Sequence, residues 1–135
     1  MKVLSLFDGI SCGMLALQRA GIPVECYDAF EIDKYAVTVS KRNFPVIVHH
    51  GNVYDGDFTQ FRGYDLLLGG SPCTYWSIAK KDREVDCNGE GFRLFKEYVR
   101  ALEESGCKYF LYENNYSVHQ RIKDEISKTL GVEPI

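Results

Sequence analysis

The stretch Lys2-Val3-Leu4-Ser5-Leu6-Phe7-Asp8-Gly9 sets the expected fold of this chain. A short, mainly apolar run ends abruptly in an acidic residue and a glycine, which is typical of a buried strand followed by a tight turn. Residues 11–20 carry apolar side chains at helical spacing, and Gly21 follows as a stop signal. We therefore expect a strand, a glycine turn and a helix, which together form the first unit of an α/β domain.

The same alternation continues along the chain. Strands joined by helices predict a mainly parallel sheet with helices on both faces. Ser11 and Asp33 are the expected N-caps of the first two helices. Further strands are predicted at 24–31, 46–48, 64–68 and 108–112, further helices at 33–43, 92–105 and 118–130, and a polar loop at 69–91.

The last four residues have the pattern of the first part of a β-strand. Val132-Glu133-Pro134-Ile135 resembles the start of another strand. A parallel sheet cut at that point has an unpaired edge, which favours pairing with another chain. We therefore expect the C-terminal strands of the sheet to be missing, and the open edge to bind either a complementing C-terminal half or a second copy.

Composition limits the class of protein. The 135 residues are 45% hydrophobic and 26% charged, with a net charge of −3, which fits one globular domain in aqueous solution. No apolar stretch approaches the length of a membrane span, and the N-terminus lacks the features of a signal peptide, so we expect a cytoplasmic protein. The five cysteines and three histidines show no metal-ligand spacing, which argues against a metal site.

The turn Phe7-Asp8-Gly9-Ile10-Ser11-Cys12-Gly13 is a candidate cofactor site. Its glycines let a ligand approach the backbone, and the helix N-terminus behind it favours negative charge. The spacing is not Gly-x-Gly-x-x-Gly, which disfavours a dinucleotide diphosphate. Glu31 ends the second strand, where a carboxylate can bind ribose hydroxyls, although a solvated strand end is the alternative. Together the two features favour a nucleoside cofactor without a diphosphate, such as S-adenosylmethionine.

Gly69-Gly70-Ser71-Pro72-Cys73 follows the most buried strand and is a candidate nucleophile loop. Two glycines free the backbone, and Pro72 stiffens the approach to Cys73. A structural loop cysteine is the alternative. Glu113 favours the catalytic interpretation, because it follows the strand expected beside this one and precedes two asparagines, a polar cluster that is costly to place at the edge of a core. A carboxyl group there can donate a proton while the sulfur attacks carbon.

These motifs, in this order and at these spacings, resemble the N-terminal portion of the DNA cytosine-C5 methyltransferase family, including its phage and prophage members. Leu6 to Gly13 is similar to the family's first motif, Gly70 to Cys73 to its nucleophile loop, and Tyr112-Glu113-Asn114 to its Glu-Asn-Val motif. The resemblance extends over nearly the whole chain. It implies a Rossmann-like, S-adenosylmethionine-dependent methyltransferase fold.

The resemblance also implies the chemistry of the site. A cytosine is flipped out of the DNA duplex, Cys73 adds to its C6, and Glu113 supports protonation at N3 while C5 takes the methyl group. Base contacts are implied for Ser71, Pro72, Ser77 and Asn114. Cofactor contacts are implied for Phe7, Asp8, Gly9, Ile10, Ser11, Cys12, Gly13, Glu31, Ile32, Asn52, Val53, Gly70, Pro72 and Leu94.

The chain departs from the family pattern in several places. Thr74 stands where the family usually has glutamine, Asn115 where it has valine, and Asn52 where an aspartate contacts the adenine. The arginine-bearing motif, the target-recognition domain and the late cofactor segment have no counterpart in residues 1–135. We therefore expect an incomplete catalytic domain, active on DNA in a bacterial or phage-infected cell once completed. The alternatives are a catalytically silent remnant that binds cofactor or a partner, and an enzyme that modifies cytosine nucleotides.

Overall fold

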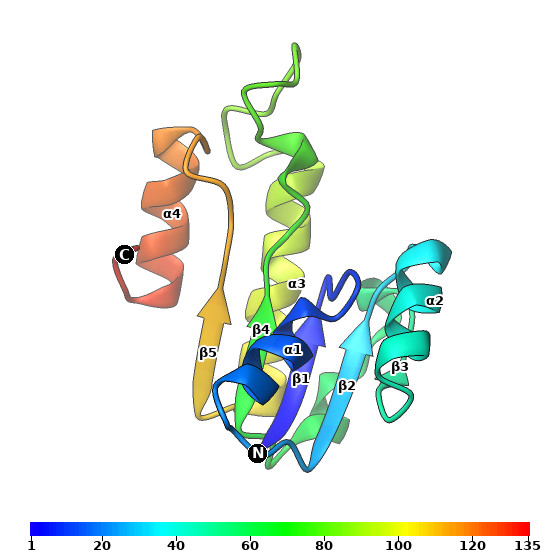
Figure 1. Ribbon diagram of the computed structural model, residues 1–135. Coiled ribbons are helices and arrows are strands. Elements are labelled where there is room, and N and C mark those ends of the chain that lie inside the picture. The colour runs from blue at the N-terminus through cyan, green and yellow to red at the C-terminus, as the bar shows by residue number, and fades with distance from the viewer.

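A computed structural model describes all residues, 1–135. Its centre is a five-stranded sheet with the order β3-β2-β1-β4-β5. All neighbouring strands are parallel, as their common direction in Figure 1 shows. The strands are β1 (Lys2–Leu6), β2 (Cys26–Phe30), β3 (Val48–His49), β4 (Leu66–Gly69) and β5 (Tyr109–Tyr112).

Helices cover both faces of the sheet, with α1 in front and α3 behind in Figure 1. The alternating pattern and the predicted parallel α/β fold are therefore confirmed. None of the helices has the length and apolar character that a membrane crossing requires. The helices are α1 (Cys12–Arg19), α2 (Lys34–Asn43), α3 (Glu90–Ser105) and α4 (Gln120–Leu130), with short 3-10 helices η1 (Val53–Asp55), η2 (Phe58–Phe61) and η3 (Cys73–Tyr75).

Two apolar layers hold these helices on the sheet. Alternate residues of β1 point to opposite faces, so that Val3 packs with Met14 of α1 while Leu4 packs in the layer of Tyr98 of α3. All four side chains are nearly or fully buried, and Val3, Leu4 and Met14 each contribute about 1.5–3 kcal/mol by leaving water. A third cluster, around Phe95, joins α3 to α4.

Two local expectations are wrong. Ser11 occupies the N-cap position of α1 but has a left-handed φ of 67° and makes no side-chain cap, because its hydroxyl bonds to Asp8 instead. Residues 132–135 form no strand, because Gly131 ends α4 in a left-handed turn and the Val132 N–H bonds back to the carbonyl of Ser127. Asp33 does cap α2, accepting from two backbone N–H groups.

Strand β5 has one neighbour and one uncovered face. It pairs with β4 alone, and its outer edge is free. Phe110 and Tyr112 pack toward α3, whereas Tyr109 and Leu111 on the other face are 52% and 61% exposed. The predicted open edge is therefore present on β5.

Candidate active site

The four sequence segments that carry the predicted site end at one edge of the sheet. Leu6 of β1 is in register with Phe30 of β2 and with Gly69 of β4, and Gly69 is in register with Tyr112 of β5. The residues that follow these four positions therefore leave the sheet side by side. Parallel α/β sheets bind ligands at this edge, where the strand order changes direction.

The glycine turn after β1 has a strained backbone. Phe7, Gly9 and Ser11 have φ angles of 55°, 60° and 67°, and two of the three are not glycine. Asp8 holds this conformation from inside the protein. Its carboxylate accepts from the Tyr27 hydroxyl at 2.6 Å and also from two serine hydroxyls, those of Ser5 and Ser11. The side chain of Asp8 therefore shapes the turn from behind.

A polar chain continues from this turn to β3. The hydroxyls of Ser11 and Ser40 lie 2.5 Å apart, and Ser40 lies 3.2 Å from Nε2 of His49. Both serines are fully buried, and Nδ1 of His49 is buried without a hydrogen-bond partner. Burial lowers the pKa of the His49 imidazole. Burial and the charge of Asp8 both raise the pKa of the Tyr27 hydroxyl.

Glu31 joins the first two segments. Its carboxylate accepts from the Gly9 N–H at 2.7 Å and from the Asp33 N–H at 2.9 Å. Each carboxylate oxygen keeps a further lone pair for a hydroxyl donor. Ile32, which follows, is 74% exposed beside it. A carboxylate fixed by two backbone donors and an exposed apolar side chain thus lie at the end of β2.

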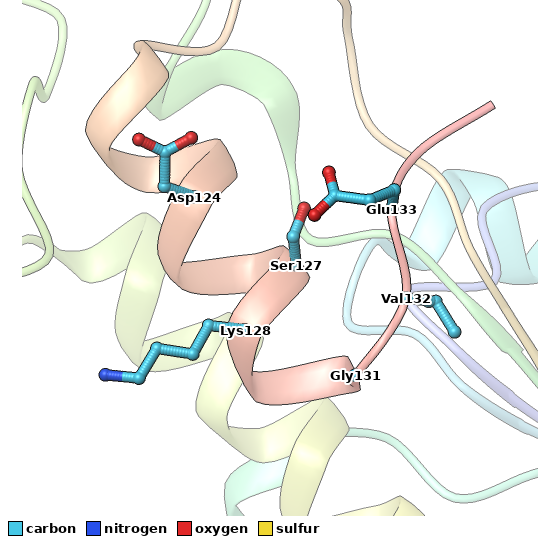
Figure 2. A pocket seen from close by; sticks show the side chains of 6 residues that line it. All are labelled: Asp124, Ser127, Lys128, Gly131, Val132 and Glu133. Carbon is cyan, nitrogen blue, oxygen red and sulfur yellow. The ribbon is translucent and has the colours of Figure 1, made fainter.

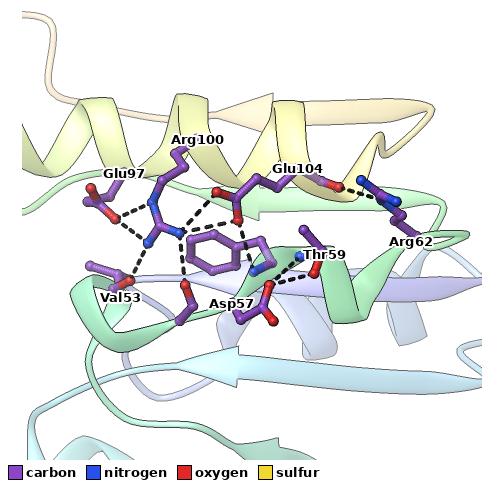
Figure 3. Close-up of polar contacts among 9 residues, drawn as sticks. Val53, Asp57, Thr59, Arg62, Glu97, Arg100 and Glu104 are labelled. Carbon is purple, nitrogen blue, oxygen red and sulfur yellow. Dashed lines mark hydrogen bonds and ion pairs between the residues drawn. The ribbon is translucent and has the colours of Figure 1, made fainter.

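The segment after β3 is fastened to α3 by Arg100, as Figure 3 shows. The guanidinium donates to the carbonyls of Val53 at 3.0 Å and Gly56 at 2.8 Å, and its centre lies 4.4 Å from the ring centroid of Phe58. Val53 is 5% exposed, so its side chain is buried and not available to a ligand. The amide of Asn52 accepts from the Tyr54 N–H and has no other partner.

The predicted nucleophile loop is tied to the end of β5. The Ser71 hydroxyl lies 2.7 Å from the Tyr112 hydroxyl, and the Asn114 amide donates to the Ser71 carbonyl at 2.9 Å. Glu113 donates its N–H to the carbonyl of Gly69 at 2.9 Å. Cys73 is exposed at the start of η3, and Glu113 is exposed on the neighbouring strand end. Both side chains are therefore open to a ligand at the same edge.

The comparison with known families decides the identity of this arrangement. The family description of the C-5 cytosine-specific DNA methylases matches residues 1–130. The chain belongs to this family.

Relatives of the methylase chain are found among phage and bacterial enzymes. The orphan methyltransferase M.SPRI of Bacillus phage SPR is 38% identical over 98% of this chain. The orphan methyltransferase M.Rho11sI of Bacillus phage rho11s is 36% identical, and the type II methyltransferase M.HgiCII of Herpetosiphon aurantiacus is 34% identical, each over 84% of this chain. These matches span 29%, 23% and 25% of the relatives' own lengths, respectively.

Solved structures confirm the methyltransferase fold. The S. pombe Dnmt2 methyltransferase superposes with a TM-score of 0.73 at 20% identity, over 97% of this chain and 40% of that one. The Spodoptera frugiperda DNMT2 gives a TM-score of 0.69 at 23% identity, over 95% of this chain and 40% of that one.

The remaining predicted site residues of the methylase domain differ in how far they are exposed. Pro72 is half-buried at the N-cap of η3, and the Ser77 N–H donates to the carbonyl of Cys73 at 2.9 Å. Leu94 is half-buried and packs against the core cluster on the α3 face. Ile10 and Cys12 are exposed on the glycine turn.

Glu84 also belongs to this region, although no local sequence pattern indicates it. Trp76 is fully buried three positions after Cys73, and its indole N–H donates to the Glu84 carboxylate at 3.2 Å. The available signal was the tryptophan itself, because a buried indole N–H requires an acceptor. Three acidic residues, Asp82, Glu84 and Asp86, follow it within ten positions, and the sequence does not distinguish among them.

The hollow in Figure 2 is separate from the strand-end site. It lies at the C-terminal end of α4 and contains none of the predicted catalytic or cofactor residues. Its lining is formed by Asp124, Ser127, Lys128, Gly131, Val132 and Glu133.

Proposed function

We propose that this chain is the cofactor-binding and nucleophile-bearing part of a DNA cytosine-C5 methyltransferase. The observation that carries the proposal is the pair of hydrogen bonds that join Ser71 to Tyr112 and Asn114, the second donated by the Asn114 amide to the Ser71 carbonyl. They hold the loop of Cys73 against the strand end of Glu113, in a chain that belongs to the C-5 cytosine methylase family. These contacts bring the exposed side chains of Cys73 and Glu113 to the same edge of the sheet, as a nucleophile and a proton donor acting on one base would require.

The glycine turn and Glu31 suit S-adenosylmethionine, which supplies the methyl group when it is bound. Glu31 would accept from the ribose hydroxyls with its remaining lone pairs, since the N–H groups of Gly9 and Asp33 already orient its carboxylate. Ile32 would pack on the adenine, and the free amide of Asn52 would hydrogen-bond its edge. The conformation of the turn, which Asp8 fixes from inside, would present backbone groups to the methionine part.

Cys73 and Glu113 would act on a cytosine that has left the duplex. The Cys73 sulfur bonds to C6, and Glu113 supports protonation at N3, so that C5 becomes electron-rich. After C5 has taken the methyl group, its proton passes to a water molecule, and the electrons of that bond form the C5–C6 double bond. The bond between sulfur and C6 then breaks, N3 returns its proton to Glu113, and the Cys73 thiolate is released. Ser71, Pro72, Ser77 and Asn114 would line the base.

Activity on DNA would require more protein than these residues. The chain spans 29% of the length of the phage SPR enzyme and 40% of the S. pombe Dnmt2 structure. Its net charge of −3 is not the basic balance that contacts with DNA phosphates favour. We propose that a C-terminal portion, placed along the free edge of β5, supplies DNA recognition.

Trapping of the base tests the catalytic part of this proposal. The chain is mixed with the C-terminal remainder of M.SPRI, S-adenosylmethionine and a duplex that contains 5-fluorocytosine. We expect a covalent adduct at Cys73, located by mass spectrometry, and no adduct with Cys73→Ser. An adduct that survives this substitution refutes the role of Cys73. Cofactor binding without any adduct favours the silent-remnant alternative.

Calorimetry with S-adenosylmethionine tests the cofactor site in the chain alone. Glu31→Ala removes the charged acceptor of the ribose hydroxyls, and we expect about a tenfold or larger rise in Kd. Glu25→Ala is the control, because this carboxylate is exposed and pairs only loosely with Lys2 at 3.8 Å. Equal affinities for the two variants would show that the ribose assignment is wrong.

A further inference from the structure

The carboxylate of Glu84 fixes the end of the polar loop to the start of helix α3. Its two oxygens accept from the backbone N–H groups of Glu90 at 2.9 Å and Gly91 at 3.1 Å. A side chain at Gly89 would place its β-carbon 2.1 Å from the carboxylate carbon of Glu84. The Glu84 carboxylate therefore contacts the N-terminus of α3 directly, where a negative charge is favourable.

The same residue holds the turn of the nucleophile. The Glu84 N–H donates to the carbonyl of Tyr75 at 2.9 Å, and the Trp76 N–H donates to the carbonyl of Cys73 at 3.0 Å. The Trp76 indole, itself bonded to Glu84, lies so close to the helix that a β-carbon at Gly91 would fall 2.6 Å from its nitrogen. The position of the Cys73 turn thus depends on the first turn of α3.

The cofactor side of the site reaches this same helix turn. Tyr54 follows Asn52 in the segment expected to contact the adenine, and its hydroxyl donates to the Glu90 carboxylate at 2.6 Å. Tyr54 is 45% exposed, and partial desolvation together with this bond raises its pKa to about 12. Glu90 is therefore contacted by Tyr54 through its side chain and by Glu84 through its backbone.

We propose that Tyr54 and Glu84 are positioning residues that couple the adenine segment to the Cys73 turn through the first turn of α3. The inference rests on the proposed cofactor site. Binding of cofactor beside Asn52 fixes Tyr54, Tyr54 fixes Glu90, and the shared helix turn holds Glu84 with the nucleophile turn. The cofactor thereby makes Cys73 less mobile before any base arrives.

Trp76 and Cys73 provide two direct measurements of this coupling. Trp76 is the single tryptophan of the chain, so its fluorescence reports on the nucleophile turn alone. The rate of Cys73 alkylation by iodoacetamide is followed by peptide mass spectrometry, with and without S-adenosylhomocysteine. In the unmodified chain we expect the ligand to change Trp76 emission and to slow alkylation of Cys73 about fivefold or more.

Two substitutions separate positioning from simple stability. With Tyr54→Phe, calorimetry still shows binding, but both responses at the nucleophile turn are lost. With Glu84→Gln, one amide oxygen replaces two carboxylate acceptors, so Cys73 alkylates faster and Trp76 emission shifts to the red even without ligand. The matched controls are Tyr109→Phe and Glu103→Gln, because both side chains are exposed and neither makes a side-chain hydrogen bond. They should behave as the unmodified chain.

The outcomes are distinct. Calorimetric binding with an unchanged alkylation rate overturns the coupling and leaves the proposed cofactor site intact. Binding with a response that persists in Tyr54→Phe overturns the role of Tyr54. Absence of any binding to the unmodified chain overturns the cofactor site and the coupling together.

Discussion

The backbone of Gly70 lies directly against the end of β5. A β-carbon at this position would fall 2.0 Å from the carbonyl oxygen of Glu113 and 3.4 Å from its carboxylate. The glycine is therefore needed for close approach of two strand ends. The two glycines in sequence indicate a loop with a free backbone, but the contact that requires glycine at position 70 is with Glu113, more than forty positions away in the chain.

Gly70→Ala tests this close approach. We expect the free energy of unfolding, measured in urea, to fall by about 1–3 kcal/mol or more, because Glu113 must move aside. Gly21→Ala is the control: its φ is +70°, with nothing within 4 Å, so it has only the conformational cost of about 1 kcal/mol. Equal losses for the two variants would contradict the steric explanation.

His49 makes the stability of the folded chain depend on pH. Burial lowers its pKa below the ordinary 6.5, with Lys41 and His50 acting in the same direction and Asp8 opposing them. The unfolded chain therefore binds more protons once the pH falls below about 6.5, and stability is lost from there down to the folded pKa. We expect His49→Gln to flatten the unfolding free energy between pH 5 and 7. A curve parallel to that of the unmodified chain would refute this.

At the scale of elements, α3 positions both halves of the site. Its first turn contacts the nucleophile loop through Glu84, and its middle holds the segment after β3 through Arg100. Glu97 and Glu104 flank the guanidinium at 2.5 and 3.2 Å, which keeps the charge paired while it donates to two carbonyls. An Arg fork suits this task, because it donates in several directions at once.

Arg100→Met keeps most of the apolar stem and removes the guanidinium. We expect a loss of about 2 kcal/mol or more in the free energy of unfolding, because the carbonyls of Val53 and Gly56 lose a charged donor. Arg93→Met on the same helix is the control. Arg93 is exposed and lies 3.7 Å from Glu90, so we expect a change within about 0.5 kcal/mol. Chemical denaturation of both variants measures the two losses of unfolding free energy. Equal losses would show that Arg100 contributes no more than an exposed arginine.

The elements themselves could be predicted from local patterns. Apolar runs, helical spacing and caps such as Asp33 depend on residues near one another in sequence, and the structure follows them to within a few residues. The failures have a different origin. Ser11 was expected to cap a helix, but the left-handed backbone and the carboxylate of Asp8 redirect its hydroxyl. Glu84 and Arg100 act through contacts between distant segments, which no local pattern encodes.

For the whole molecule, the outer side of β5 is an exposed and unpaired part of the sheet. Its free edge and the apolar side chains of Tyr109 and Leu111 predict self-association of the 135-residue chain. In sedimentation, the average mass should rise with concentration, and Leu111→Lys should keep the chain monomeric. Val46→Lys is the control, at a position 70% exposed next to β3. A concentration-independent monomer for the unmodified chain would contradict the prediction.

The strand order also has a consequence during synthesis of the protein. β1 leaves the ribosome first, yet it lies between β2 and β4, and its Leu4 pairs with Leu67. Until β4 has been translated, the buried strand β1 of the nascent polypeptide lacks its second neighbour. Non-local strand pairing of this kind is slow, and it leaves apolar surface exposed that favours aggregation. Codons that slow elongation before β4 would prolong this exposure and increase the chain's demand for chaperones.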